Sequence, residues 1–244
     1  MYTIRPLLLS TVETNRSMMT YTLYFNKTDS NPMVSWYINA DGKHILVDTG
    51  ISVEEHKKIA NVPMNDVQSF EAALQNIGLK PEDIDIVIQT HLHYDHCANT
   101  SKCTNAKVVV QEKELMFAYS HDPVFHHLYV RKYFEGLNYR LIDGKMEIVP
   151  GIEVIPMTGH TPGCQAVSVK TPQGLAVISG VCAIKENFFP PPKLASIWPV
   201  LIPTFHIDAK KSFYDLLYIK HLADILIPQH DIGFASMKEI PANK

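Results

Sequence analysis

Short runs of apolar and β-branched residues recur along the whole chain, and several are apolar at nearly every position, which is typical of strands buried on both faces. Strands are expected at residues 34–39, 44–48, 84–89, 106–111, 152–157, 165–171, 175–180 and 223–229. Helical spacing of apolar residues predicts helices over 65–76, 112–119 and 208–222. The dipeptides Asp41-Gly42 and Asp143-Gly144 indicate hairpin turns. Together these patterns predict mixed α/β layers.

A compositional break interrupts this pattern at residues 188–199, which read FFPPPKLASIWP. Consecutive prolines fix an extended backbone there, beside aromatic side chains. Connecting segments run over the surface by default, so we expect a surface connector, with part of a pocket wall as the alternative.

Composition and charge narrow the class of protein. At 244 residues with 46% hydrophobic content, the chain can bury a sizeable core, and we treat residues 1–244 as a single domain. A formal net charge of −3 and no long Lys or Arg run argue against a nucleic-acid partner. The longest apolar stretches are too short for a membrane span, and no secretory signal is evident, so a cytoplasmic protein is expected. Four cysteines without a C-x-x-C pair favour reduced thiols.

The stretch THLHYDHCAN, residues 90–99, contains a dense cluster of side chains that can bind metals. His91, His93, Asp95 and His96 fall within six residues, directly after the apolar run IDIVIQ. In an extended segment His91 and His93 point to the same side, and the following turn brings Asp95 and His96 to a neighbouring position. Imidazole nitrogens and carboxylate oxygens are ligands that zinc and similar divalent metals take. The cluster therefore predicts a metal site.

Two further histidines complete a ligand set of the size that two metals need, about six residues at about three per catalytic metal. His160 in TGHTPG and His230 in ILIPQHD each follow an apolar, strand-like run. Either one alone would be interpreted as a surface or capping residue. Histidines without such a context are assigned to structure or surface; they are His44, His56, His121, His126, His127, His206 and His221. His121, His126 and His127 are weak pocket candidates because they fall within seven residues.

These motifs carry a family resemblance. HLHYDH matches the H-x-H-x-D-H signature of the metallo-β-lactamase fold superfamily, and VDTG, TGHTPG and PQHD resemble its other strand-end motifs in the same order. LNYRLIDGKMEIVPGIEV and IKENF resemble stretches of the N-acyl homoserine lactone lactonases. The resemblance implies an αβ/βα four-layer sandwich, in which two mixed sheets pack face to face with helices outside and a dinuclear site lies at the sheet edge.

The resemblance also implies a division of the ligands. His91, His93 and His160 would hold one metal, and Asp95, His96 and His230 the other. Asp48 of VDTG would orient the ligand histidines by hydrogen bonding. We expect two divalent metal ions, with zinc favoured and iron or manganese as alternatives.

One departure from the lactonases concerns the aspartate that bridges both metals in those enzymes. Aligning IKENF places that aspartate nearest Gly180, and the region ISGVCAIKENF contains no acid before Glu186. Cys182 is a candidate replacement ligand, although a buried small hydrophobe is the ordinary interpretation of a free cysteine. The tyrosine that the lactonases present shortly afterwards is also missing, because Ala183 and Ile184 stand there.

The expected activity is hydrolysis of a lactone or small ester by metal-bound hydroxide, with N-acyl homoserine lactones as the first substrate class. Asp95 would be catalytic by passing a proton to the leaving oxygen. Three alternatives remain open: a glyoxalase-II-like thioesterase, an iron-dependent oxidoreductase of the same fold, and a metal-binding protein without catalysis. The expected partner is a small-molecule substrate, and a homodimer is possible.

Substrate contacts are expected from residues 13–25, ETNRSMMTYTLYF, which resemble the lactonase loop that overhangs the site. We expect an apolar channel lined by Met18, Met19, Tyr21, Phe188 and Phe189. The alternative for each of these side chains is ordinary core packing.

Overall fold

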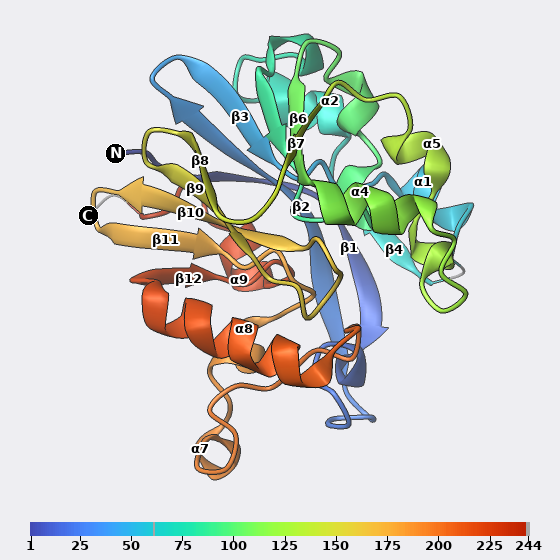
Figure 1. The fold of residues 1–244 in the computed structure, drawn as a ribbon, viewed down its shortest axis with the longest axis vertical. Helices are drawn as coiled ribbons and strands as arrows, with labels where there is room; N and C mark the ends of the chain where they lie inside the picture. The colour runs from blue at the N-terminus through green and yellow to red at the C-terminus, as the bar shows by residue number, and fades with distance from the viewer. Residues whose placement is uncertain (61, 243–244) are drawn as a thin grey trace.

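Two β-sheets packed face to face form the centre of the computed structural model, which describes residues 1–60 and 62–242 (Figure 1). The first sheet has seven strands in the order β4-β1-β2-β3-β5-β6-β7. These strands are β1 (Arg5–Asn15), β2 (Thr28–Ala40), β3 (Lys43–Val47), β4 (Met64–Asp66), β5 (Ile86–Ile88), β6 (Lys107–Gln111) and β7 (Tyr139–Ile142).

The second sheet has five strands in the order β12-β11-β10-β9-β8. They are β8 (Met146–Val149), β9 (Ile152–Pro156), β10 (Gln165–Thr171), β11 (Gly174–Ile178) and β12 (Ile225–Ile227). Both sheets are mixed. In the first, β3, β5, β6 and β7 run parallel, and in the second β12 runs parallel to β11. Parallel neighbours end at the same edge of a sheet, so the segments that follow β3 and β5 lie side by side there.

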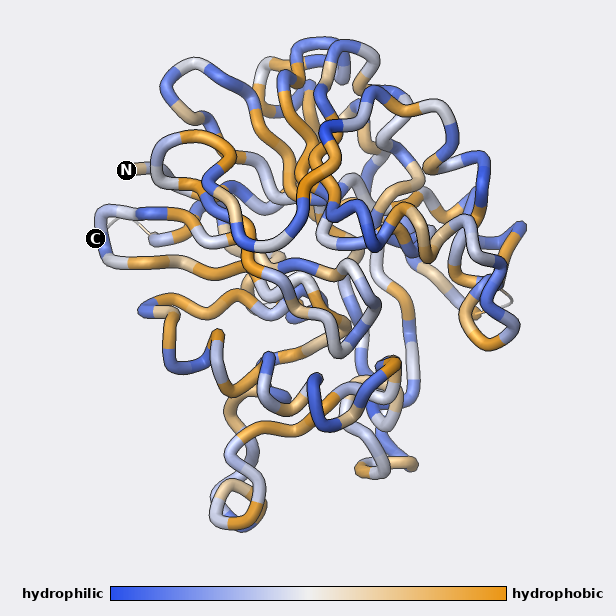
Figure 2. Tube along the Cα trace, in the orientation of Figure 1, coloured by the Kyte–Doolittle hydropathy of each residue, from blue (hydrophilic) through white to orange (hydrophobic). Residues whose placement is uncertain are grey.

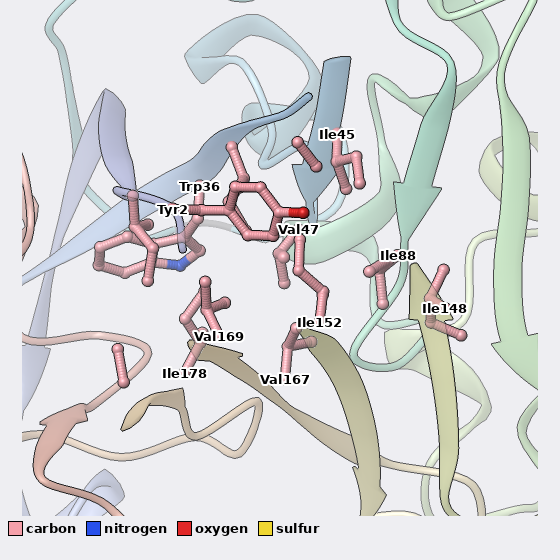
Figure 3. Close-up of a cluster of buried hydrophobic side chains, with 14 of the residues drawn as sticks. Tyr2, Trp36, Ile45, Val47, Ile88, Ile148, Ile152, Val167, Val169 and Ile178 are labelled. Atoms are coloured by element: carbon pink, nitrogen blue, oxygen red, sulfur yellow. The ribbon is translucent and has the colours of Figure 1, made fainter. Parts of the chain in front are cut away.

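The main hydrophobic core fills the space between the two sheets. Figure 3 shows Trp36, Val47 and Ile88 of the first sheet facing side chains of the second sheet, and all three are fully buried. Along β3, Ile45 and Val47 face this core, whereas Leu46 faces a second core on the outer side. Burial on both faces explains why these strands are apolar at successive positions, as the hydropathy of the central segments in Figure 2 shows.

Helices cover the outer faces of both sheets, on opposite sides of the molecule (Figure 1). Helix α2 (Phe70–Gln75) packs Phe70 and Leu74 against the first sheet. Helix α8 (Ala209–Leu222) packs Leu216 and Ile219 against the second. The predicted αβ/βα four-layer sandwich is therefore confirmed.

Shorter helices connect the strands. They are α1 (Val53–Lys57), α3 (Tyr94–Cys97), α4 (Glu112–Tyr119), α5 (Arg131–Phe134), α6 (Lys185–Phe188), α7 (Pro192–Ala195) and α9 (Ile232–Ala235). Among residues 1–60 and 62–242, no helix combines the length and the apolar character that a membrane crossing requires.

Two expectations differ from the structure, and one long strand was not expected. The helix predicted over 65–76 begins only at Phe70, because Met64–Asp66 pairs with β1 as strand β4. The hairpin predicted at Asp143-Gly144 is wrong, since the strands on either side belong to different sheets. The Gln111 side chain holds both the N–H and the carbonyl of Gly144 at this crossover. The eleven-residue strand β1 was not predicted.

The turn at Asp41-Gly42 is a hairpin, as predicted, between the antiparallel strands β2 and β3. Both residues have positive φ, +54° and +89°, which suits a type I′ turn. The segment 188–199 contains helix α7, and its aromatic side chains differ in solvent exposure. Phe188 is buried, whereas Trp198 is 45% exposed.

Candidate metal centre

Segments that follow three strands bring the predicted ligand residues together. His91 and His93 follow β5, Asp95 and His96 lie in α3, His160 lies between β9 and β10, and His230 follows β12. Two groups of three residues result: His91, His93 and His160, and Asp95, His96 and His230. Within each group the ligand-type atoms lie within 4.8 Å of one another.

The first group has the dimensions of a coordination site. His91 Nε2 lies 3.1 Å from His93 Nδ1 and 3.2 Å from His160 Nε2. Nitrogens bound tetrahedrally at about 2.0–2.1 Å from one zinc ion would be about 3.3 Å apart. A divalent cation fits this donor set.

The protonation states also suit a cation. Burial, reinforced by the neighbouring histidines, lowers the pKa of His91 well below its usual value, and the same holds for His93. Burial lowers the pKa of His160 to about 4 and also lowers that of His230. These imidazoles are therefore neutral at pH 7, which is the form that binds metals.

His96 differs because two carboxylates flank it. Burial lowers its pKa, but the negative charges of Asp95 and Asp48 outweigh burial and raise the pKa overall. Its Nδ1 lies 2.8 Å from Asp48 Oδ2, and its Nε2 lies 3.5 Å from Asp95 Oδ2. The second group therefore carries more negative charge than the first.

Asp48 is the fully buried residue that directly follows β3, and it has a φ of +57°. Its Oδ1 accepts the Thr90 backbone N–H at 2.7 Å, and its Oδ2 accepts the Thr90 hydroxyl at 2.7 Å. The same Oδ2 accepts the Gln229 amide at 3.0 Å. One carboxylate thus joins loops that follow β3 and β5 of the first sheet and β12 of the second.

Backbone carbonyls orient two other histidines. Nδ1 of His160 lies 2.7 Å from the Phe205 carbonyl oxygen, and Nδ1 of His230 lies 3.2 Å from that of Pro32. A carbonyl can only accept, so Nδ1 carries the proton and Nε2 is left with its lone pair for a metal.

Glu114 of α4 was missed by sequence reasoning. Its fully buried carboxylate accepts the Leu92 N–H, the Tyr129 hydroxyl, the Thr161 hydroxyl and the Gly163 N–H. Burial raises its pKa, although these hydrogen bonds act in the opposite direction. Glu114 therefore ties the H-x-H loop to the TGHTPG loop. An acid on a short helix is ordinarily expected in solvent, so the sequence offered no signal for this role.

The six residues line a cavity of about 120 Å³. Apolar side chains form much of the remaining wall, namely Val12, Met18, Met19, Met33, Val62, Leu128 and Phe205. The other polar side chains of the wall are Thr14, His56, Tyr94 and Cys182. His121, His126 and His127, the weak pocket candidates, do not line this cavity.

The predicted substrate contacts do not all lie at this cavity. Met18 and Met19 line it, but Tyr21 lines a separate, largely apolar cavity of about 420 Å³ together with Trp198. The expectation for Phe188 is wrong, because this side chain is fully buried in the core beneath α8. Phe189 is 51% exposed, lies outside the metal cavity, and has the Lys220 ammonium over its ring.

The strand end that carries the bridging aspartate in lactonases is closed to an acid here. Gly180 has a φ of +68°, and a Cβ atom added to it would lie 2.1 Å from the Gln165 carbonyl oxygen. Cys182 lines the cavity, but it belongs to neither group of three, and its Sγ lies 3.5 Å from Met19 Sδ. Burial raises the pKa of its thiol.

The fold and the site agree with a family assignment from sequence. The sequence pattern of the metallo-beta-lactamase superfamily matches residues 31–228, so the chain belongs to that superfamily. Among curated proteins, the chain is 29% identical over 171 residues to the N-acyl homoserine lactonase AiiA of Bacillus thuringiensis subsp. kurstaki. That match covers 64% of this chain and 66% of AiiA, just under two thirds of AiiA's length. A probable metallo-hydrolase of Methanocaldococcus jannaschii is 28% identical over 158 residues, covering 65% of this chain and 62% of that protein.

Solved structures share the fold. A quorum-quenching N-acyl homoserine lactone lactonase superposes with a TM-score of 0.76 at 24% identity, covering 95% of this chain and 92% of that one. AidC, a dizinc quorum-quenching lactonase, superposes with a TM-score of 0.62 at 16% identity, covering 84% of this chain and 74% of that one.

Replacing Asp48 with asparagine tests whether this carboxylate supports the centre. Asp48→Asn keeps the size of the side chain but removes the charge beside His96. It also replaces one of the two acceptor oxygens by an NH2 donor. We expect a loss of metal affinity of about 10–100-fold, as for other residues that orient metal ligands. Competition with a chromogenic chelator measures it, with Asp66→Asn, at an exposed position of β4, as the matched control. Equal affinities in the two variants would contradict this role.

Proposed function

We propose that this protein is a metal-dependent hydrolase that opens a lactone or a related small ester, with N-acyl homoserine lactones as the first substrate class to test. One observation carries the proposal: two groups of three ligand-type side chains converge on one partly apolar cavity. The relatives support it, since AiiA is an N-acyl homoserine lactonase. One solved neighbour contains the product N-hexanoyl-L-homoserine at its catalytic metal centre.

The proposed cofactor is a pair of divalent cations. His91, His93 and His160 would hold one, and Asp95, His96 and His230 the other; zinc suits this mixture of nitrogen and oxygen donors. When bound, such a pair supplies water that ionises near neutral pH and a Lewis acid for the substrate carbonyl.

The side chains of this protein would supply the remaining functions. Asp95 is the carboxylate of the cavity wall in the described part of the chain, and we assign to it the transfer of a proton to the leaving alkoxide oxygen. The neutral, buried histidines keep their lone pairs available because burial opposes their protonation. Met18, Met19 and Met33 present flexible apolar surface to the part of the substrate beyond the lactone ring.

Cys182 is proposed as an additional ligand of the second metal, because it lines the cavity beside a strand end that has no space for the bridging acid. The contact between its thiol and Met19 Sδ is the competing arrangement, in which the thiol only packs.

Cobalt spectroscopy separates these two arrangements. If Cys182 binds the metal, the Co²⁺-substituted protein shows a thiolate-to-cobalt charge-transfer band in the near ultraviolet, and Cys182→Ser abolishes it. Cys164→Ser is the matched control, because Cys164 is fully buried and lies outside the cavity wall. Absence of the band from the unmodified protein would show that Cys182 only packs.

Metal removal combined with a substrate panel tests the activity itself. The panel contains N-hexanoyl homoserine lactone, an aryl ester and an acyl-glutathione thioester. We expect lactone turnover that dialysis against a chelator abolishes and that two equivalents of Zn²⁺ per chain restore. His230→Ala should lower the metal content by about one ion, because it removes one of about three protein ligands. Preferred turnover of the thioester would instead favour a glyoxalase-II-like enzyme, and a metal-loaded protein inactive on the whole panel would contradict the proposal.

The methionine wall predicts a dependence on chain length. Met19→Ala removes apolar surface from the cavity, so the KM for a decanoyl lactone should rise more than the KM for a butanoyl lactone. A difference of about fourfold to fifteenfold corresponds to the loss of one to two buried methylene contacts. Phe189→Ala is the control, since Phe189 lies outside the cavity and should leave the ratio unchanged. If the ratio of the two KM values were unchanged in Met19→Ala, the methionine side chains would not contact the acyl chain of the substrate.

A further inference from the structure

Two short segments, residues 17–23 and 200–205, contribute to both the metal cavity and the apolar cavity of about 420 Å³. Met19 of the first segment and Phe205 of the second line the metal cavity. Tyr21 and other members of both segments line the apolar cavity. The two segments therefore form a wall that has a cavity on each side.

Backbone hydrogen bonds join the two segments of this wall. The Tyr21 N–H donates to the Ile202 carbonyl at 2.9 Å, and the Thr204 N–H donates to the Met18 carbonyl at 3.2 Å. Where a cavity adjoins a wall, packing contacts are missing, so hydrogen bonds contribute more to holding it in place. The position of the wall therefore depends on the polar groups that anchor it.

Asn187 of α6 is the buried anchor of both segments. Its side-chain Nδ2 donates to the Met19 carbonyl at 2.6 Å and to the Leu201 carbonyl at 2.8 Å. Its Oδ1 accepts the Ile184 N–H at 2.8 Å, and the residue is fully buried. Both donor hydrogens of the amide are thus used, one on each segment. One side chain fixes Met19 relative to Leu201.

A second contact from α6 reaches the same loop at its surface. Glu186 Oε2 lies 3.0 Å from Arg16 Nη1, and the two side chains are 17% and 27% exposed. The Arg16 carbonyl accepts the Met19 N–H at 2.9 Å. Solvent reaches the ion pair and weakens it, whereas the Asn187 amide is shielded from water. Asn187 is therefore the stricter constraint on Met19.

We propose that Asn187 is a positioning residue, which sets where the Met19 side chain meets the acyl chain of the substrate. The inference rests on the proposed lactone hydrolysis. A methionine side chain is flexible, so its contact with a ligand depends on where its backbone is fixed. Asn187 is fully buried and lies outside the wall of the metal cavity, so it acts through Met19 and not by touching the substrate.

Replacing Asn187 with aspartate removes both anchoring bonds with little change of size. Asn187→Asp keeps Oδ1 but turns the NH2 donor into an oxygen that faces two carbonyls. The ratio of the KM for a decanoyl lactone to the KM for a butanoyl lactone should rise by about fourfold to fifteenfold, because a displaced Met19 loses the contacts that Met19→Ala removes. The Kd values of N-decanoyl-homoserine and N-butanoyl-homoserine, measured by calorimetry on the zinc-loaded protein, should change in the same ratio without any turnover.

A double-mutant cycle separates positioning from a merely structural role. If Asn187 acts through Met19, the effect of Asn187→Asp on both ratios should disappear in the Met19→Ala background. Asn99→Asp is the matched control, because the buried Asn99 amide also donates to two carbonyls, those of Thr49 and Gly50, at 2.9 and 3.3 Å. Both aspartate variants should lower the Tm, but Asn99→Asp should affect the two chain lengths equally.

The outcomes separate the two proposals. If Asn187→Asp does not fold, Asn187→Ser decides the same comparison, since it leaves room for a water between the two carbonyls. A lowered Tm with unchanged ratios, or a change of ratio that persists in the Met19→Ala background, would overturn the role of Asn187. If the unmodified protein hydrolysed neither lactone, the proposed function would fail, while the Kd ratio would still decide the role of Asn187.

Discussion

The buried carboxylate of Asp48 is the interaction on which the rest of the site depends. It sits at the end of β3 and accepts hydrogen bonds from Thr90 after β5 and from Gln229 after β12, so one side chain fixes loops from both sheets. It also fixes the ring of His96. A carboxylate without water requires several donors, and this requirement makes the three loops mutually dependent. The α/β sandwich brings these strand ends together, and the hydrogen bonds of Asp48 hold their spacing.

A second buried acid, Glu114, likewise holds two of the ligand loops together by accepting hydrogen bonds. Glu114 joins the loop of His91 and His93 to the loop of His160 through Leu92, Thr161 and Gly163. The histidines between these two acids are crowded, with the His91 and His96 ring centroids 4.0 Å apart, and His91, His93 and His160 are neutral. Neutral rings packed so closely, with lone pairs facing one another, are expected when a cation satisfies them. The polar scaffold thus holds a preformed set of metal-ligand side chains, and methionines supply part of the apolar cavity wall around them.

The backbone conformation at Gly180 accounts for the missing acid at this strand end. At Gly180 the positive φ and the nearby Gln165 carbonyl leave no space for a side chain, so restoring the acid would require the strand end to move. Tyr94, His56 and Cys182 occupy the wall near Asp95 instead.

The local sequence pattern determined the layers of this protein and its candidate ligand residues. Apolar strands predicted the layers, and the spacing of HLHYDH, TGHTPG and PQHD predicted the six residues that the structure brings together, because strand ends in an α/β sandwich converge on one edge. Contacts between segments distant in sequence could not be predicted in this way. Met64–Asp66 became a strand by pairing with β1, the chain crossed between sheets at Gly144, and Phe188 turned into the core. The burial of Glu114 and of His56 was likewise decided by tertiary packing, because burial depends on neighbours that local periodicity does not specify.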